Sequence, residues 1–128
     1  MKLLLDTHTF LWLVEGSPKL SATATAALAD PVNELFLSVA SVWELAIKTG
    51  NKKLALSDPL DVYVARWTPV YQLDLLPILS SHALGVSGLP DLHSDPFDRM
   101  LISQSQIEGM TLVSRDTKLA SYGLPILW

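Results

Sequence analysis

The stretch Lys2-Leu-Leu-Leu-Asp-Thr7 decides the fold, because it places a carboxylate directly behind a short apolar run. The run Lys2–Leu5 predicts a buried strand, and the polar pair that follows it predicts the start of a helix. A second strand is expected at Glu34–Ser38, followed by apolar residues at helical spacing up to Gly50. Strands that alternate with helices predict a parallel sheet covered by helices on both faces.

The rest of the chain continues this alternation without a repeat or a long linker. Further helices are expected at His8–Glu15, Ser21–Asp30, Val39–Gly50, Pro59–Thr68, Ser80–Val86, Pro96–Glu108 and Asp116–Ser121, with a loop at Ser87–Asp95. Further strands are expected at Gln72–Leu75, Thr111–Ser114 and Ile126–Trp128. The sequence therefore predicts one α/β domain over residues 1–128, a three-layer α/β/α sandwich with a mainly parallel central sheet.

Composition narrows the class of protein. Of the 128 residues, 49% are hydrophobic and only 17% are charged, which is enough for a packed core and argues against disorder. The absence of cysteine excludes disulfides and thiolate metal sites and is compatible with a reducing cytoplasm. The apolar run before Asp6 is only three residues long, and no run approaches the ~18 needed to span a bilayer, so we expect a cytoplasmic protein.

Five acidic residues are expected at one edge of the sheet. Two of them follow strands: Asp6 ends the first, and Asp116 lies two residues beyond Thr111–Ser114. Glu44 falls in the second turn of the helix that leaves the second strand. Asp98 falls in the first turn of the helix that begins at Pro96, and Asp95 directly precedes this helix. Because functional crevices lie beyond the carboxyl ends of parallel strands, this edge is a candidate Mg²⁺ or Mn²⁺ site.

Each acid also has a purely structural interpretation. Asp95 is the natural N-cap of its helix, Asp98 would complement the helix dipole, and Asp116 would cap the short helix that follows it. Asp6 is the hardest to explain structurally, because a carboxylate that ends a buried strand is costly without a partner. Taken singly, structural roles are favoured for most of the acids, but not for the whole set.

Glu44 has two structural alternatives. With Ser41 it spells a Ser-x-x-Glu capping box, but Ser38 is the better cap because it keeps Val39 in the apolar stripe. Glu44 then lies one turn from Lys48, either as a surface ion pair or as a metal ligand.

Four motifs in register resemble the PIN-domain proteins, and in particular the VapC-like toxins of bacterial type II toxin–antitoxin systems. They are Leu-Leu-Leu-Asp6-Thr7-His8, Ser41-Val-Trp-Glu44-Leu-Ala-Ile-Lys48, Asp95-Pro-Phe-Asp98-Arg99 and Leu-Val-Ser114-Arg115-Asp116. The ending Tyr122–Trp128 matches as well, so that the resemblance covers nearly the whole chain. In the helix that begins at Pro96, Ser103 and Ser105 stand where members of this family commonly have small apolar residues, which affects packing only.

The resemblance implies a PIN-like nuclease domain whose catalytic and metal-binding residues are Asp6, Glu44, Asp98 and Asp116. Thr7 and Ser114 would support these ligands, and Asp95 would have a more structural role. The implied activity is that of a Mg²⁺- or Mn²⁺-dependent endoribonuclease that leaves 5′-phosphate and 3′-hydroxyl ends. The implied partners are a cognate VapB-like antitoxin, held against the early helices, and a second copy in a homodimer.

Basic and aromatic residues supply the remaining expectations. Lys48, Arg99 and Arg115 are candidate substrate contacts beside the acids, which would offset the net charge of −4 locally. Lys48 could equally belong to a lysine-rich face exposed to solvent. Arg99 could equally serve as a counter-ion for the acids. Trp12 and Trp67 belong either to the core or to the antitoxin surface. Two of the histidines, His82 and His93, are expected at the surface or in loops.

Two other functions remain open. In an aspartyl-phosphate enzyme of the phosphatase or receiver type, Asp6 would be the phosphorylated residue. A dehalogenase-type phosphatase would, however, carry a second aspartate where this chain has His8, and a receiver would carry an acid pair elsewhere. A catalytically silent PIN-like binding module is the second alternative, although all four acids are present.

Overall fold

Five parallel strands form the central sheet in the computed structural model, which describes all 128 residues. The strand order is β3-β2-β1-β4-β5, so the first strand of the chain lies in the middle. The strands are β1 (Lys2–Leu5), β2 (Glu34–Ser38), β3 (Leu73–Leu76), β4 (Thr111–Val113) and β5 (Ile126–Leu127). Leu5 pairs in register with Leu37 on one side and Val113 on the other, which brings three strand ends level at one edge.

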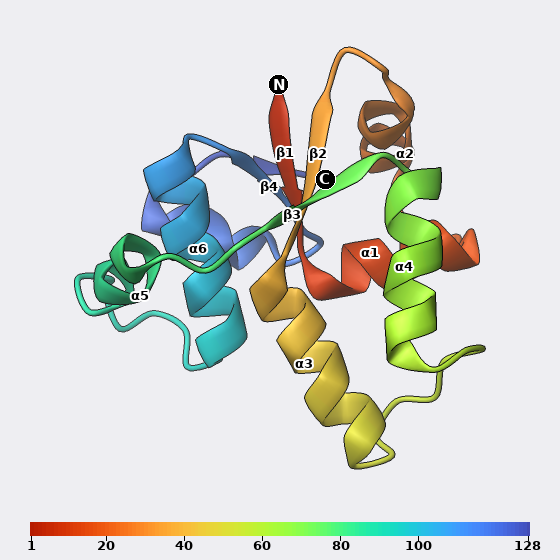
Figure 1. The fold of residues 1–128 in the computed structure, drawn as a ribbon. Coiled ribbons are helices and arrows are strands. Elements are labelled where there is room, and N and C mark those ends of the chain that lie inside the picture. Colours follow the sequence, from red (N-terminus) through yellow and green to blue (C-terminus); the bar gives the residue numbers. More distant parts are fainter.

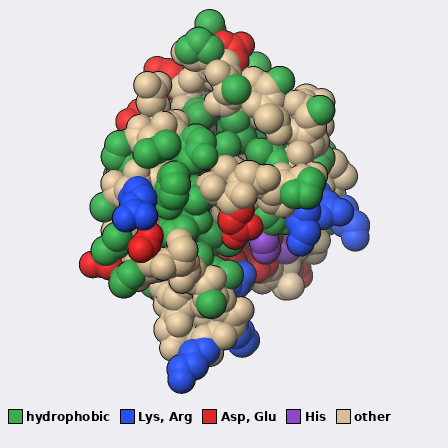
Figure 2. Space-filling view, turned by 90° about the vertical axis from the view of Figure 1, so that its right-hand side faces the viewer, with side chains coloured by type: hydrophobic (Ala, Val, Ile, Leu, Met, Phe, Trp, Pro, Cys, Tyr) green, Lys and Arg blue, Asp and Glu red, His purple; other side chains and the backbone are tan.

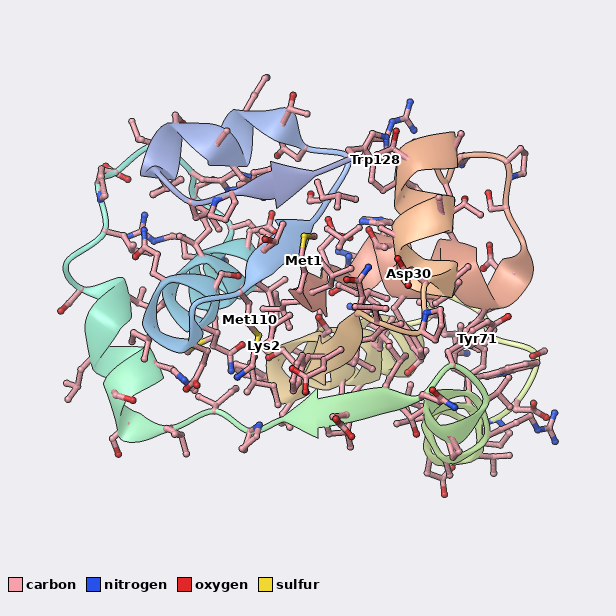
Figure 3. All side chains as sticks on the ribbon, turned by 90° about the horizontal axis from the view of Figure 1, so that it is seen from above. Met1, Lys2, Asp30, Tyr71, Met110 and Trp128 are labelled. Carbon is pink, nitrogen blue, oxygen red and sulfur yellow. The ribbon has the colours of Figure 1, made fainter.

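Helices cover both faces of this sheet (Figure 1). One group contains α1 (Thr7–Glu15), α2 (Ala22–Ala29) and α4 (Leu60–Val70). The other contains α5 (Ser80–Val86), α6 (Pro96–Glu108) and the 3₁₀ turn η1 (Thr117–Tyr122). Figure 3 shows the same layers from above, with the central strand marked by Met1 and Lys2. α3 (Val39–Gly50) projects from the edge where β2 ends.

The alternation of β1 side chains divides the core into two halves. Leu3 and Leu5 pack with Phe10 of α1 and Tyr63 of α4 in one cluster. Leu4 packs on the opposite face, in a cluster to which α6 and η1 also contribute. The members of this second cluster include Leu101, Ile102, Met110, Leu112 and Leu119. The predicted three-layer sandwich is confirmed, and its sheet is entirely parallel.

His82 is fully buried in α5, so the expectation of a surface or loop position was wrong. Burial is possible because both ring nitrogens have partners. Nδ1 accepts the Leu79 N–H at 3.0 Å, and Nε2 lies 2.8 Å from a carboxylate oxygen of Glu108. A polar ring whose hydrogen bonds are all made can be buried without the usual desolvation penalty.

Length and hydropathy of the helices bear on the membrane question. None of the helices combines the length and the apolar character that a bilayer crossing requires.

Candidate active site at the carboxyl edge of the sheet

Three of the predicted acids serve as helix caps as well as lying at the sheet edge. Asp6 follows β1, and its Oδ1 accepts the Thr9 N–H at 2.8 Å. Asp95 caps α6 by accepting the N–H groups of Phe97 and Asp98 at 2.8 and 3.2 Å. Asp116 accepts the Lys118 N–H at 3.2 Å at the start of η1. The structural and the functional interpretations of these acids are thus compatible, because in each acid only one carboxylate oxygen accepts the capping hydrogen bond.

A cavity of about 360 Å³ opens at this edge. Its lining residues are Asp6, His8, Trp12, Asp98, Ser114, Arg115 and Asp116. They come from three separate parts of the chain that meet where β1 and β4 end. Figure 2 shows acidic and histidine side chains side by side on the surface over α1, with basic side chains next to them. Only one lining residue is hydrophobic, so the cavity suits a polar or charged ligand.

Glu44 lies behind this cavity and is 7% exposed. Its Oε1 accepts the Thr7 hydroxyl at 2.6 Å, and its Oε2 accepts Lys48 Nζ at 2.7 Å. Thr7 Oγ also lies 3.0 Å from Ser41 Oγ, so that Ser41 supports the pair and does not cap the helix. Ser38 caps α3 instead, as predicted, by accepting the Ala40 N–H.

The strongest electrostatic effect falls on Asp98. Burial is the largest cause, and it raises the pKa of this carboxyl from 3.8 to about 6. Repulsion from Asp95, Asp6 and Glu44 raises the pKa further, whereas His93 opposes the shift. Carboxylates from three parts of the chain are therefore close enough to disfavour one another's charge, which is the condition that a cation relieves.

His93 is the residue of this edge that the sequence did not indicate. Its Nε2 lies 3.3 Å from Asp98 Oδ2 and 3.5 Å from Asp116 Oδ2. The sequence could have indicated this contact, because His93 lies two residues before the Asp95 cap. A turn at that point directs the side chain back toward the start of the helix. The expectation of a loop position is confirmed, but the side chain belongs to the acid cluster.

The basic residues have differing surroundings. Lys48 is paired with Glu44, and Arg115 lies 5.8 Å from the centre of the Trp12 ring at the cavity wall. Arg99 donates to loop carbonyls, namely those of Pro90, His93 and Val86 at 3.0–3.3 Å. The Arg99 guanidinium is thus engaged in holding the loop before α6, and of the three, Arg115 is the one that lines the cavity.

A divalent cation would match the chemistry of these donors, although the side chains are not arranged around one position. In this conformation no group of three or more histidine, aspartate or glutamate side chains is placed to hold an ion. Both oxygens of Glu44 have partners, and His93 lies between Asp98 and Asp116. Oxygen ligands and unrelieved negative charge nevertheless fit Mg²⁺ or Mn²⁺. Small side-chain rotations would be needed to complete the site.

Comparison with known proteins gives a consistent result. The family model of the PIN domain matches residues 3–124. Ribonuclease VapC22 of Mycobacterium tuberculosis is 27% identical over 124 residues, covering 95% of this chain and 92% of that protein.

Solved structures agree on the fold. A chain of VapBC2 from Rickettsia felis, bound to a DNA fragment from its promoter, superposes with a TM-score of 0.70 at 18% identity. That superposition covers 98% of this chain and 97% of the other. A chain of VapBC-1 from nontypeable Haemophilus influenzae gives 0.68 at 17% identity, covering 98% and 96%.

Proposed function

Because this chain belongs to the PIN-domain family, we propose that it is a metal-dependent endoribonuclease that hydrolyses RNA phosphodiester bonds. The observation that carries the proposal is the cavity in which Asp6, Asp98 and Asp116 meet from separate parts of the chain. Burial and the neighbouring carboxylates also raise the pKa of Asp98 to about 6. Acidic side chains brought together in this way suit a bound cation, which would offset their negative charge.

Asp6, Glu44, Asp98 and Asp116 would hold Mg²⁺ or Mn²⁺, which when bound supplies an activated water and offsets the charge on the phosphate. The protein's own residues orient these ligands. Thr7 fixes one oxygen of Glu44, and the backbone of Asp116 donates to Ser114 Oγ at 3.1 Å, which shapes the turn after β4. Asp95 holds the start of α6, on which Asp98 lies.

RNA would approach along the open side of the cavity. Arg115 lines this side, and Lys48 lies next to Glu44, so that both can contact phosphates on either side of the bond that is cleaved. Lys48 would then exchange its ion pair for a phosphate once Glu44 turns toward a cation.

We also propose that the protein is the toxin of a type II toxin–antitoxin pair, with a VapB-like antitoxin, and that it forms a homodimer and acts in the cytoplasm as one domain. The similarity to Ribonuclease VapC22 and to chains of VapBC complexes supports the pairing. Figure 2 shows a broad area of apolar side chains over the α1, α2 and α4 face, which suits an apolar segment of a partner. Val14, Leu56 and Trp67 are only partly buried there.

Digestion of RNA by the purified protein tests the proposed activity. We expect cleavage with Mg²⁺ or Mn²⁺, none with a chelator, and loss of cleavage in Asp6→Asn and Asp98→Asn. Asp74→Asn is a matched control, because Asp74 is an exposed aspartate on β3, outside the cavity. Undiminished cleavage by either site variant would refute the assignment. Folded protein that binds RNA without cutting it would favour the catalytically silent binding module. An acyl-phosphate on Asp6 would favour the phosphotransferase.

A further inference from the structure

The loop between α5 and α6 places an imidazole among the proposed ligands. His93 Nε2 lies within 3.3–3.5 Å of one oxygen each of Asp98 and Asp116, and its side chain is 25% exposed. These two aspartates come from α6 and from the turn after β4, so the ring bridges separate elements. No other side chain contacts both of them by a hydrogen bond or an ion pair.

The direction of the ring is fixed by its other nitrogen. Nδ1 accepts the backbone N–H of Asp95 at 3.1 Å, and Asp95 is itself held as the cap of α6. A neutral imidazole has one donor and one acceptor nitrogen, so the acceptor role of Nδ1 leaves the hydrogen on Nε2. His93 therefore presents an N–H donor, and no lone pair, to the two carboxylates.

The backbone of this loop is also held. Arg99, the residue after Asp98, donates to the carbonyl of His93 at 3.3 Å and to that of Pro90 at 3.0 Å. Its second terminal nitrogen donates to the carbonyl of Val86 at 3.3 Å. The guanidinium thereby ties two points of the loop and the end of α5 to the helix that bears Asp98, so that the position of the ring is built into the fold.

A bound cation and this N–H compete for the same oxygens. Mg²⁺ binds carboxylate oxygens at about 2.0–2.1 Å, so an ion held between Asp98 Oδ2 and Asp116 Oδ2 would need the space that the His93 Nε2–H now occupies. His93 is not arranged as a metal ligand either. A neutral ring with a free lone pair on Nε2 would carry its hydrogen on Nδ1, where that hydrogen would face the Asp95 N–H. The two states of the site are mutually exclusive.

We propose that His93 is a positioning residue, which holds Asp98 and Asp116 in the metal-free protein and gives up both contacts when a divalent cation binds. This inference rests on the proposed metal-dependent function. In the metal-free protein the His93 N–H takes the place of the cation. It limits the repulsion between the two aspartates and lowers the apparent metal affinity.

Metal titration of the full chain tests this inference without reference to RNA. We expect His93→Ala to bind Mn²⁺ roughly two- to tenfold more tightly in calorimetry, since about one hydrogen bond no longer has to be broken. The same variant should melt at a lower temperature than the parent in chelator and gain more from added Mn²⁺. His93→Gln, which keeps an N–H donor, should lie closer to the parent in both measurements.

His8→Ala is the matched control, because His8 lines the same cavity but makes no hydrogen bond or ion pair with the acids. It should titrate like the parent. In proton NMR with Mg²⁺, the His93 ring signals of the parent should shift and those of His8 should not.

Weaker Mn²⁺ binding by His93→Ala would make His93 a ligand and overturn the inference. Binding and melting equal to those of the parent would overturn it as well. If the parent cleaves RNA with Mg²⁺ while either result is found, the inference fails and the proposed function stands. A parent that binds neither Mg²⁺ nor Mn²⁺ would overturn both.

Discussion

Two polar clusters include residues of α6. They differ in whether their polar and charged groups all have partners. The first, the His82 cluster, consists of Ser38, His82, Ser103, Gln104 and Glu108. The second, the acid cluster, consists of Asp6, Glu44, His93, Asp95, Asp98 and Asp116. Both contain a histidine contact to a carboxylate, at 2.8 Å in the first and 3.3–3.5 Å in the second.

The His82 cluster is closed. Ser38 donates to the Gln104 side-chain oxygen at 2.5 Å, the Gln104 amide donates to the Pro77 carbonyl, and Ser103 donates to the His82 carbonyl. The acid cluster instead keeps negative charges together, and burial with the neighbouring carboxylates raises the pKa of Asp98. A buried cluster with every partner present stabilises the fold, whereas one with surplus charge indicates a ligand. This difference can be tested by changing one residue at a time.

The largest effect is expected for Glu44→Gln. The side chain keeps its shape but loses its charge, and we expect RNA cleavage to fall roughly 10²- to 10³-fold, the range for loss of one charge-stabilising group. Stability should change by less than about 1 kcal/mol, because Lys48 can turn to solvent. The measurements are cleavage rate and urea denaturation.

Lys48→Met decides between the two interpretations of Glu44. If Glu44 served only as an ion-pair partner, Glu44→Gln would leave cleavage intact, and the two variants would alter stability equally. That pattern would remove Glu44 from the proposed site.

A loss of stability of about 2–3 kcal/mol is expected for His82→Ala, because the change leaves a cavity and removes the partners of Glu108 and of the Leu79 N–H. Cleavage per folded molecule should be retained. Urea denaturation with a parallel cleavage assay provides both values. His8→Ala, at an exposed histidine, should change stability by no more than about 0.5 kcal/mol. Equal stabilities of the two variants would contradict the structural role of the His82 cluster.

The pH dependence of stability should reveal the raised pKa of Asp98. Because its pKa is about 6 when folded and 3.8 ordinarily, the folded protein holds a proton between roughly pH 4 and 6 that the unfolded chain has released. The free energy of unfolding therefore falls as pH rises through this window and is lowest, in this respect, above pH 6. We expect Asp98→Asn to lack this contribution and to be the more stable protein at pH 7 in chelator.

Urea denaturation of both proteins at pH 4.5, 5.5 and 7 measures the difference, which should grow with pH. Mg²⁺ should stabilise the parent and not the variant. A difference that stays constant with pH would contradict the effect of crowding on Asp98.

The sequence was sufficient for the fold because its signals were local and mutually consistent. The Pro96–Glu108 helix was predicted with its observed bounds, since the Asp95 cap, Pro96 and Gly109 mark both ends. The α1 helix starts one residue earlier than expected, because Asp6 itself caps it. Deviations elsewhere are of one or two residues at element ends, where hydrogen bonds fray.

The site could be predicted only in part. Parallel strands align their ends, so Asp6 and Asp116 could be assigned to one edge from the sequence. The burial of His82 and the contacts of His93 depend on partners far along the chain or on a loop conformation, which no periodicity encodes. The loop-binding role of Arg99 was missed for the same reason, since its acceptors are backbone carbonyls that any sequence would provide.

The smallest effect is expected at Tyr63 of α4, which is buried like the His82 cluster but lacks its matched hydrogen bonds. Its hydroxyl is buried without a hydrogen-bond partner. Burial, Glu15 and Tyr71 raise its pKa to about 12, so it stays neutral at ordinary pH. Tyr63→Phe removes an unsatisfied polar group and keeps the ring, and should stabilise the protein by up to about 1 kcal/mol in urea denaturation. A loss of stability would mean that the hydroxyl has a partner in solution, and the contrast between matched and unmatched polar groups would then be confined to the charged acid cluster.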